Sequence, residues 1–369
     1  MPLTMIRTPT AKYLLFLGVL FYGLCASAQQ TRVVAITGTV LDDSTSAPLS
    51  NVNVYIANTT LGCNTDEKGH FEIRNIPAGT HEIVVSRIGY AFYSARKSLI
   101  DTQTRSFEIR LKPMSIELGE MVVSAPDPTE WRKQLLRFSD LFLGTTRNAK
   151  QCKIVNPEVL DFKSEGPEFF EATARQPLEV DNVALGYRIQ FLLRTFKYQG
   201  DILTYELLPK FTELKPSTLS QAAEWKLNRI AAFRGSLRHF LISLFKKQLT
   251  RDGYSIYHLD FLQAGQVQSA RQLLTEDEIL SEGPSPAQKA VRFGGFLEVE
   301  YWGEAENGYN LLHKSGTTGQ VSWISLNYIA MTITDRGFID EGFATKTFGY
   351  WAWKRMGDML PLDFEPGEE

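Results

Sequence analysis

Short segments in which apolar and polar residues alternate dominate the sequence between residues 33 and 125. Alternation with a period of two places successive side chains on opposite faces of a strand, so each segment predicts a β-strand with one buried face. The segments recur at the spacing of an all-β domain, and no helical period fits this part of the chain. They cover residues 36–41, 52–56, 70–74, 81–86, 106–112 and 121–124. The pattern predicts a small all-β sandwich over residues 33–125.

Turn-forming residues separate these segments. Asp66-Glu67-Lys68-Gly69 precedes the third segment, and Asn75-Ile76-Pro77-Ala78-Gly79 connects the third to the fourth. Aspartate and asparagine start turns because their side chains bond nearby backbone, and glycine accepts a positive φ without steric cost. The turns therefore support a domain built from short strands.

The order of these residues resembles a carboxypeptidase-like regulatory domain. The resemblance is carried by Gly38-x-Val40-x-Asp42, Pro48-Leu49-x-x-Val52-x-Val54, Gly62, Thr65-Asp66-x-x-Gly69-x-Phe71, Ile76-Pro77-x-Gly79 and Gly89-Tyr90. It implies a transthyretin-like fold and an accessory module, not a peptidase, so no catalytic residues carry over. In the envelopes of Bacteroidota-type bacteria such modules are often attached to a TonB-dependent receptor.

The next residues extend this comparison. Residues 116–125 resemble the segment that follows the module in such receptors, where it can pair with TonB as an added strand. The alternative is the last strand of the sandwich, running into a linker at residues 126–129. Because no plug or barrel follows, the sequence favours the last strand. An accessory role in a TonB-dependent outer-membrane uptake system stays open.

The first 28 residues have the pattern of a secretory signal peptide. Arg7 and Lys12 precede a short apolar run, and Ala26-Ser27-Ala28 forms the cleavage site. The run is shorter than the ~20 residues that a membrane-spanning helix needs. Lipoprotein anchoring at Cys25 is disfavoured because Leu24, not a small residue, precedes it. The sequence predicts an exported protein of the periplasm or the outer-membrane surface.

Charge and cysteine content exclude several classes of protein. Cleavage after Ala28 changes the net charge from −3 to −5, which argues against a nucleic-acid partner. No later segment is apolar enough for a transmembrane helix. Cys63 and Cys152 remain, and we expect them to be unpaired because they fall in different domains. No metal or cofactor motif is present, so neither a metal nor a cofactor is predicted.

Residues 130–369 have the mixed pattern of an α+β domain. Helical spacing predicts helices over 130–143, 219–249 and 351–356, with Gly235 weakening the centre of the second. The turn at 199–201 predicts a hairpin between two strands. The predicted strands cover residues 186–198, 202–212, 253–261, 291–302 and 321–334. The fold class predicted for the whole chain is a multi-domain protein, an all-β sandwich followed by an α+β domain.

Several motifs in this second part resemble an uncharacterised group of secreted Bacteroidota-type proteins that also begin with the regulatory module. They are Cys152-Lys153-Ile154-Val155-Asn156-Pro157-Glu158, Pro177-Leu178-x-Val180-x-Asn182, Trp225-x-x-Asn228-Arg229, Phe233-Arg234-Gly235-Ser236 and Gly349-Tyr350-Trp351. The resemblance implies architecture and origin, and the group has no agreed activity to carry over.

Two sets of residues are weak candidates for catalysis. Ser236, His239 and Asp260 have the types of a nucleophile, a base and an orienting carboxylate. Ser236 lacks the small-residue elbow that exposes a nucleophile, so a helix cap or surface pair is the favoured interpretation. Glu298 and Glu300 share one face of a predicted strand, as paired carboxylates of a glycosidase would. An exposed strand with a solvated acidic edge is the favoured alternative for this pair.

Two segments carry opposite charge. Residues 215–251 hold eight basic side chains against Glu224, and residues 276–306 hold eight acidic ones against Lys289 and Arg292. One interpretation is a basic face for an anionic envelope glycan, a lipid headgroup or an acidic protein. The other is that the two segments neutralise each other or are simply solvated. The candidate ligand-binding residues are Trp225, Arg229, Arg234 and Arg238, with Phe233 nearby.

The functional hypothesis is a non-catalytic, secreted envelope protein with a binding or assembly role. Its β-sandwich would act as a docking or spacer module, and its partner would be an envelope protein or an anionic glycan. An envelope hydrolase with a site around Ser236 and His239 is the alternative. The ligand, the oligomeric state and the orientation of the domains stay open.

Overall fold

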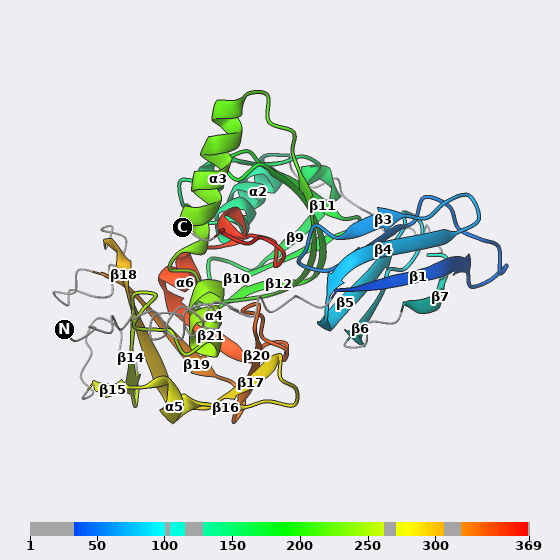
Figure 1. The fold of residues 1–369 in the computed structure, drawn as a ribbon. Coiled ribbons are helices and arrows are strands. Elements are labelled where there is room, and N and C mark those ends of the chain that lie inside the picture. The colour runs from blue at the N-terminus through cyan, green and yellow to red at the C-terminus, as the bar shows by residue number, and fades with distance from the viewer. Residues whose placement is uncertain (1–32, 100–103, 115–127, 262–270, 306–318, 368–369) are drawn as a thin grey trace, which may run out of the picture.

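The computed structural model describes residues 33–99, 104–114, 128–261, 271–305 and 319–367 (Figure 1). It confirms the predicted fold class, an all-β sandwich followed by an α+β part. The described residues form three large apolar cores, one in the sandwich and two in the α+β part. The predicted leader (1–28) and the segment 116–125 lie outside the described residues, so these remain predictions. Of the linker predicted at 126–129, residues 128 and 129 already belong to α2(Pro128–Leu143).

The sandwich consists of two antiparallel-rich sheets around one core. Alternation along β1 places Val34, Ile36 and Val40 inside, as the sequence predicts. The parallel pairing of β1 with β7 closes the first sheet. That sheet has the order β4(His70–Pro77), β1(Val33–Asp42), β7(Arg105–Leu111), and the second has β3(Gly62–Asn64), β2(Asn53–Ile56), β5(Gly79–Ser86), β6(Tyr93–Leu99).

The predicted sandwich strands are confirmed wherever they fall within the described residues, while two short strands escaped prediction. β3 has three residues, and β6 carries mostly polar side chains on the edge of its sheet. An edge strand covered on one side only needs no continuous apolar face, so its sequence resembles a loop. Cys63 and Cys152 are both free, as expected.

The first core of the α+β part lies between a six-stranded sheet and α2(Pro128–Leu143). The long strands β12(Tyr187–Gln199) and β13(Ile202–Glu213) form the predicted hairpin, and Gly200 and Asp201 both have positive φ in its two-residue turn. Phe138 and Phe142 of α2 pack against Phe191 and Phe196 of β12. The other strands are β8(Cys152–Ile154), β9(Leu160–Ser164), β10(Phe169–Ala174) and β11(Leu178–Asn182), connected through η1(Ala149–Gln151) and η2(Pro157–Val159).

The helical region predicted over residues 219–249 is two helices, α3(Leu219–Phe233) and α4(Leu237–Phe245). Gly235 breaks it, because its φ is +67° and a Cβ there would lie 2.7 Å from the ring of Tyr301. The hydroxyls of Thr218 and Ser236 cap the two N-termini. The prediction of a single helix is therefore wrong, and the break lies at Gly235, the residue that weakens the helical pattern in the sequence.

The second core of the α+β part lies among α4 and two further sheets. The predicted strand over 321–334 is two strands, β19 and β20, which belong to different sheets. The larger sheet has the order β15(Gln272–Leu274), β14(Tyr254–Leu259), β18(Phe296–Ala305), β19(Gly319–Leu326), β21(Thr345–Gly349), and the smaller has β16(Leu280–Glu282), β17(Gln288–Val291), β20(Met331–Thr334). Short helices α5(Glu276–Ile279), α6(Tyr350–Trp353) and η3(Met356–Asp358) complete it.

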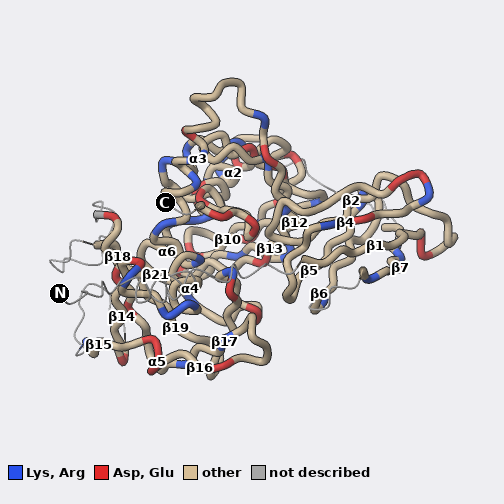
Figure 2. Tube along the Cα trace, viewed as in Figure 1, with Lys and Arg blue, Asp and Glu red and all other residues tan. Residues whose placement is uncertain are grey.

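The surface of the described chain carries both signs of charge throughout. Figure 2 shows Lys and Arg interspersed with Asp and Glu over the sandwich and the α+β part. Lys247 and Asp277, from the predicted basic and acidic segments, form one direct ion pair at 2.5 Å. No helix within the described ranges is both long and apolar enough to cross a membrane.

Candidate functional site

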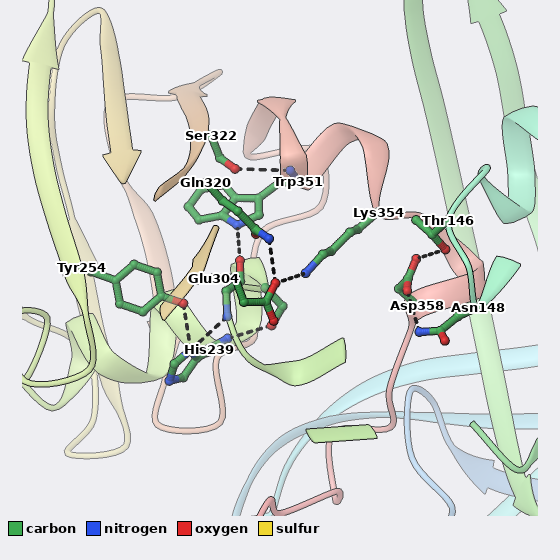
Figure 3. A network of polar contacts seen from close by, with 12 residues as sticks. Thr146, Asn148, His239, Tyr254, Glu304, Gln320, Ser322, Trp351, Lys354 and Asp358 are labelled. Atoms are coloured by element: carbon green, nitrogen blue, oxygen red, sulfur yellow. Dashed lines mark hydrogen bonds and ion pairs between the residues drawn. The ribbon is translucent and has the colours of Figure 1, made fainter. Parts of the chain in front are cut away.

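Ser236 and His239 lie in the first turn of α4, where both make structural contacts. Ser236 Oγ accepts the backbone N–H of His239 at 3.1 Å, so this hydroxyl is a helix cap. The His239 ring accepts the backbone N–H of Gly235 at Nδ1, which also lies 2.8 Å from the Tyr254 hydroxyl (Figure 3). Burial lowers the pKa of His239 to about 4, so the ring is neutral near pH 7.

Asp260 does not join these two residues. It follows the end of β14 and is exposed. Among the described residues no hydrogen bond links the Ser236 hydroxyl to the His239 ring, or that ring to Asp260. The structure therefore brings Ser236 and His239 together as a cap and its helix, and it does not assemble the three side chains into a hydrogen-bonded triad.

Three of the four predicted ligand-binding residues contact the interior of the α+β part. Trp225 is buried, and its Nε1 donates to the carbonyl of Val183 at 2.8 Å. Arg229 donates to the carbonyl of Leu185 and stacks over the ring of Tyr187. Arg238 donates to four carbonyls, those of Arg336, Pro361, Leu362 and Phe364. Of the four predicted residues only Arg234 is exposed.

Glu298 and Glu300 correct a prediction. The favoured interpretation was a solvated edge, but β18 is a central strand, and the two residues are 0% and 1% exposed. Arg271 bridges them, with its Nη2 2.7 Å from Glu298 Oε1 and 2.5 Å from Glu300 Oε1. Trp323 Nε1 donates to Glu298 Oε2 at 2.8 Å. Arg271 thus binds both carboxylates inside the sheet, and Trp323 binds one of them, so these residues form a structural ion-pair cluster.

Figure 3 shows further polar contacts within the α+β part. Gln320 of β19 donates to Glu304 of the neighbouring strand β18 at 2.6 Å. Trp351 of α6 donates its Nε1 to the carbonyl of Gly235 at 2.9 Å. Asp358 accepts from Thr146 and Asn148 at 2.7 and 2.9 Å, and burial raises its pKa. The contacts of Trp351 and Asp358 therefore join segments that are far apart in the chain.

The β-sandwich packs directly against the hairpin of β12 and β13. Tyr55 and Val84 of the sandwich form a buried apolar cluster with Leu192 and Leu208. The Tyr55 hydroxyl donates to the carbonyl of Leu208 at 3.0 Å. Arg194 of β12 pairs with Glu82 of the sandwich at 3.2 Å. The sequence left open whether the two parts touch, and the structure shows an interface with apolar, hydrogen-bonded and ionic contacts.

Backbone bonds strengthen this interface. The N–H of Asn58 donates to the carbonyl of Pro209 at 2.7 Å, and the N–H of Phe211 donates to the carbonyl of Thr59 at 3.0 Å. The N–H of Leu362 returns to the carbonyl of Asn58 at 2.7 Å. Such bonds fix orientation more tightly than side-chain contacts, because both partners belong to ordered backbone. The sandwich is therefore held in one position by two distant parts of the chain.

A cavity of about 280 Å³ lies beside this interface, with walls from both parts. The sandwich contributes the start of β5 and two residues of β6, Arg96 and Ser98. The α+β part contributes the loop before β17, the turn after β20, and Leu362 with Asp363. Ligand sites of proteins favour such concave, largely apolar spaces between domains that hold a few polar groups. This cavity is the best candidate for a functional site in the described chain.

Three basic side chains line the cavity, His81, Arg96 and Arg336. Nε2 of His81 lies 2.7 Å from the carbonyl of Pro77, to which it donates, so Nδ1 keeps its lone pair. Burial lowers the pKa of His81, and the charge of Arg336 lowers it further. Arg96 is exposed and donates to the carbonyl of Asp340, whereas Arg336 is half-buried. The cavity thus combines a neutral ring, two guanidinium groups and apolar walls.

Sequence reasoning missed this site entirely. Its walls come from residues 57–59, 77–82, 284–288, 334–338 and 362–363, with single residues of β6. None of these segments carries a catalytic or binding motif. The one usable signal is the Pro and Gly content of residues 75–79, which the sequence predicts as a turn, and of residues 283–286. Nor do the described residues contain a group of three metal-ligating side chains.

Comparison with known protein families identifies a family for the sandwich only. Residues 36–123 match the CarboxypepD_reg-like domain, which confirms the resemblance found in the sequence. No curated protein matches the chain. The family match covers the N-terminal part alone and does not describe the α+β part.

Similarities to solved structures are faint. A type II cohesin–X-dockerin complex from Acetivibrio cellulolyticus is 22% identical, covers 31% of this chain and 76% of that chain, and has a TM-score of 0.20. A group B streptococcus pilus 2b backbone protein is 18% identical over 22% and 42% of the two chains, with a TM-score of 0.20. A protein of unknown function from Bacteroides fragilis NCTC 9343 is 12% identical over 50% and 84%, with a TM-score of 0.18. Scores this low support no conclusion about the function of this chain.

Proposed function

We propose that this protein is a non-catalytic binding protein of the bacterial envelope, whose ligand enters the cavity between the β-sandwich and the α+β part. The observation that carries the proposal is the cavity itself, because two separately folded cores supply its walls. In this function the sandwich is a docking module that completes a site, rather than a spacer on a flexible linker. The fixed interface at Tyr55, Glu82 and Asn58 supports that role.

The chemistry of the cavity supports binding rather than turnover. The His81 ring is tied to a main-chain carbonyl, and Asp363 accepts two backbone or hydroxyl donors of Thr60. Glu82 is engaged by Arg194. A general acid or base has to exchange protons with a substrate, whereas groups held in this way orient and recognise one. The hydrolase hypothesis gains no support from Ser236, whose hydroxyl caps a helix.

Export is part of the proposal and rests on the leader pattern of residues 1–28. When the full chain is expressed in a Gram-negative host, we expect the mature protein in the envelope fraction with Gln29 as its first residue. N-terminal sequencing of the fractionated protein measures this, with an Ala28→Glu variant as the control for cleavage at this site. An uncleaved wild-type chain in the cytoplasm would contradict export.

Filling the cavity tests the binding site. Ser98 is an exposed residue of β6 that lines the cavity, so Ser98→Trp should place an indole in the ligand space. The neutral fluorophore N-phenyl-1-naphthylamine is a suitable probe because it is apolar and of small-molecule size. We expect saturable fluorescence enhancement with the wild type and at least tenfold weaker binding by Ser98→Trp. Loss of a preformed apolar site removes most of the buried contact area.

The matched control is Ser106→Trp. Ser106 is an exposed serine on β7 of the same sandwich and does not line the cavity. It should bind the probe like the wild type, and both variants should keep the wild-type Tm within a few degrees. Equal probe binding by the two variants would show that the dye lies elsewhere and would refute the proposed site.

A further inference from the structure

We infer that the cavity selects a ligand with one carboxylate on an apolar body, and that Arg336 binds the carboxylate. The inference rests on the proposed function, since it names the ligand class of the same cavity. It starts from a guanidinium that lines a ligand-sized space and from the surroundings of that guanidinium.

The backbone of Arg336 is fixed, while its side chain is left for another partner. Arg336 lies in the tight turn after β20, where the N–H of Gly337 donates to Thr334 at 3.0 Å and the N–H of Thr334 donates to Phe338 at 2.9 Å. The carbonyl of Arg336 accepts Nε of Arg238 at 3.1 Å. The Arg336 guanidinium forms no hydrogen bond or ion pair with any residue in the described part of the chain. A rigid turn thus presents five donors to the cavity.

Neighbouring acids do not neutralise this guanidinium. Glu82 pairs with Arg194 at 3.2 Å, and Asp363 is bonded to Thr60. Asp335, the remaining acid of the lining, forms no ion pair with Arg336 within the described residues. The charge of Arg336 does act on it, but burial outweighs that effect and raises the pKa of Asp335.

The positive charge of Arg336 affects the pKa values of two neighbouring side chains. Burial and the charge of Arg336 together lower the pKa of Arg238 to about 10. The same two causes lower the pKa of His81, against the bond to Pro77. An anion beside Arg336 would relieve both effects, and a second cation would increase them. Charge therefore favours an anionic group at this end of the cavity.

The planar shape of the guanidinium and the apolar lining of the cavity restrict which class of anion can bind. A guanidinium binds a planar carboxylate through two parallel N–H···O bonds, a geometry that a halide cannot match. Around it the walls are carbon-rich and come from Ala57, Pro77, Pro284, Phe338 and Leu362. A hydrophilic anion such as free phosphate would leave these walls without contacts. A fatty acid and the C-terminus of an apolar peptide share the required chemistry.

The test is competition against bound N-phenyl-1-naphthylamine in the full mature chain. Octanoate and N-acetyl-Leu-Phe should displace the dye, whereas octylamine and N-acetyl-Leu-Phe-amide should displace it at least tenfold more weakly. Arg336→Gln should keep the dye and lose about 10- to 100-fold in affinity for the acids, as expected for a lost charge-assisted pair. Arg336→Lys should fall in between, because it keeps the charge without the fork. Arg292→Gln, at an exposed arginine outside the cavity, is the matched control.

Each outcome decides between the two claims. If the dye binds but acids and amines compete equally, or Arg336→Gln binds acids like the wild type, the carboxylate inference fails and the cavity stands. If the dye does not bind, calorimetry with octanoate decides: heat that Arg336→Gln abolishes supports the carboxylate site, and no heat with either acid overturns both claims. Displacement by only one of the two acids identifies the source, lipid or peptide.

Discussion

Replacing Arg271 by methionine is expected to lower the free energy of unfolding by about 3–5 kcal/mol, the largest effect of any substitution considered for this protein. Arg271 is the cation that bridges Glu298 and Glu300, and both carboxylates are fully buried in the middle of a sheet. Arg271 also stacks on Tyr257, with 3.9 Å between the guanidinium carbon and the ring centroid. Without it, two like charges share an interior site with no bridging cation, which is the costly arrangement for buried charges.

Two controls separate this effect from loss of packing. The triple variant Arg271→Met, Glu298→Gln, Glu300→Gln removes the charges together, so we expect it to recover most of the lost stability. Arg188→Met removes an arginine from an exposed pair with Asp181 and should cost under about 1 kcal/mol. Chemical denaturation at pH 7 measures all three. If Arg271→Met unfolds like Arg188→Met, the cluster does not stabilise the sheet.

Acidification should destabilise the wild type through His239, by up to about 3 kcal/mol between pH 6.5 and 4. Burial lowers its folded-state pKa to about 4 from an ordinary value of 6.5. The unfolded chain binds the proton first, so stability is complete above pH 6.5 and is lost as pH falls toward 4. Asp252 opposes the shift, while Arg234 and Lys246 reinforce it.

A histidine variant isolates this contribution from other groups that titrate in the same range. We expect His239→Gln to have a lower unfolding free energy at pH 7, because the bonds from Gly235 and Tyr254 change. Between pH 6.5 and 4 its free energy should then decline less steeply than that of the wild type. His70→Gln, at an exposed histidine of the sandwich, should reproduce the wild-type slope. Parallel curves for wild type and His239→Gln would disprove the assignment.

The sandwich was predictable because its signals are local. Alternation along β1 and the Asp66–Gly69 turn depend only on residues that are neighbours in the chain, so they predict the same structure whatever packs around them. Gly235 shows the limit of such signals, because a glycine inside a helical pattern is tolerated or breaks the helix according to what it meets. Here it meets Tyr301, 66 positions away.

The candidate sites depended on contacts that spacing does not encode. Glu298 and Glu300 alternate like a solvated face, and only the neighbours of β18 together with Arg271 make that face interior. The sequence predicts that the basic residues of α3 and α4 can bind an anion. In the structure, however, Arg229 and Arg238 donate hydrogen bonds to main-chain carbonyls. Arg336 lies outside any charged segment or motif of the sequence, and nothing in its spacing predicts that it lines a cavity.

The contact of the sandwich with residues 362 and 363 sets an order on synthesis and assembly. Thr60 is bonded to Asp363, 303 positions later, and Asn58 to Leu362. Domains generally fold as units from the N-terminus while the chain is being made. The strands of the sandwich are complete at residue 111 and the hairpin on which it packs at residue 213, whereas its contacts with residues 362 and 363 wait until that part of the chain has emerged. The cavity is thus the last feature to form, and a chain interrupted before that point would carry a folded sandwich but an unfinished site.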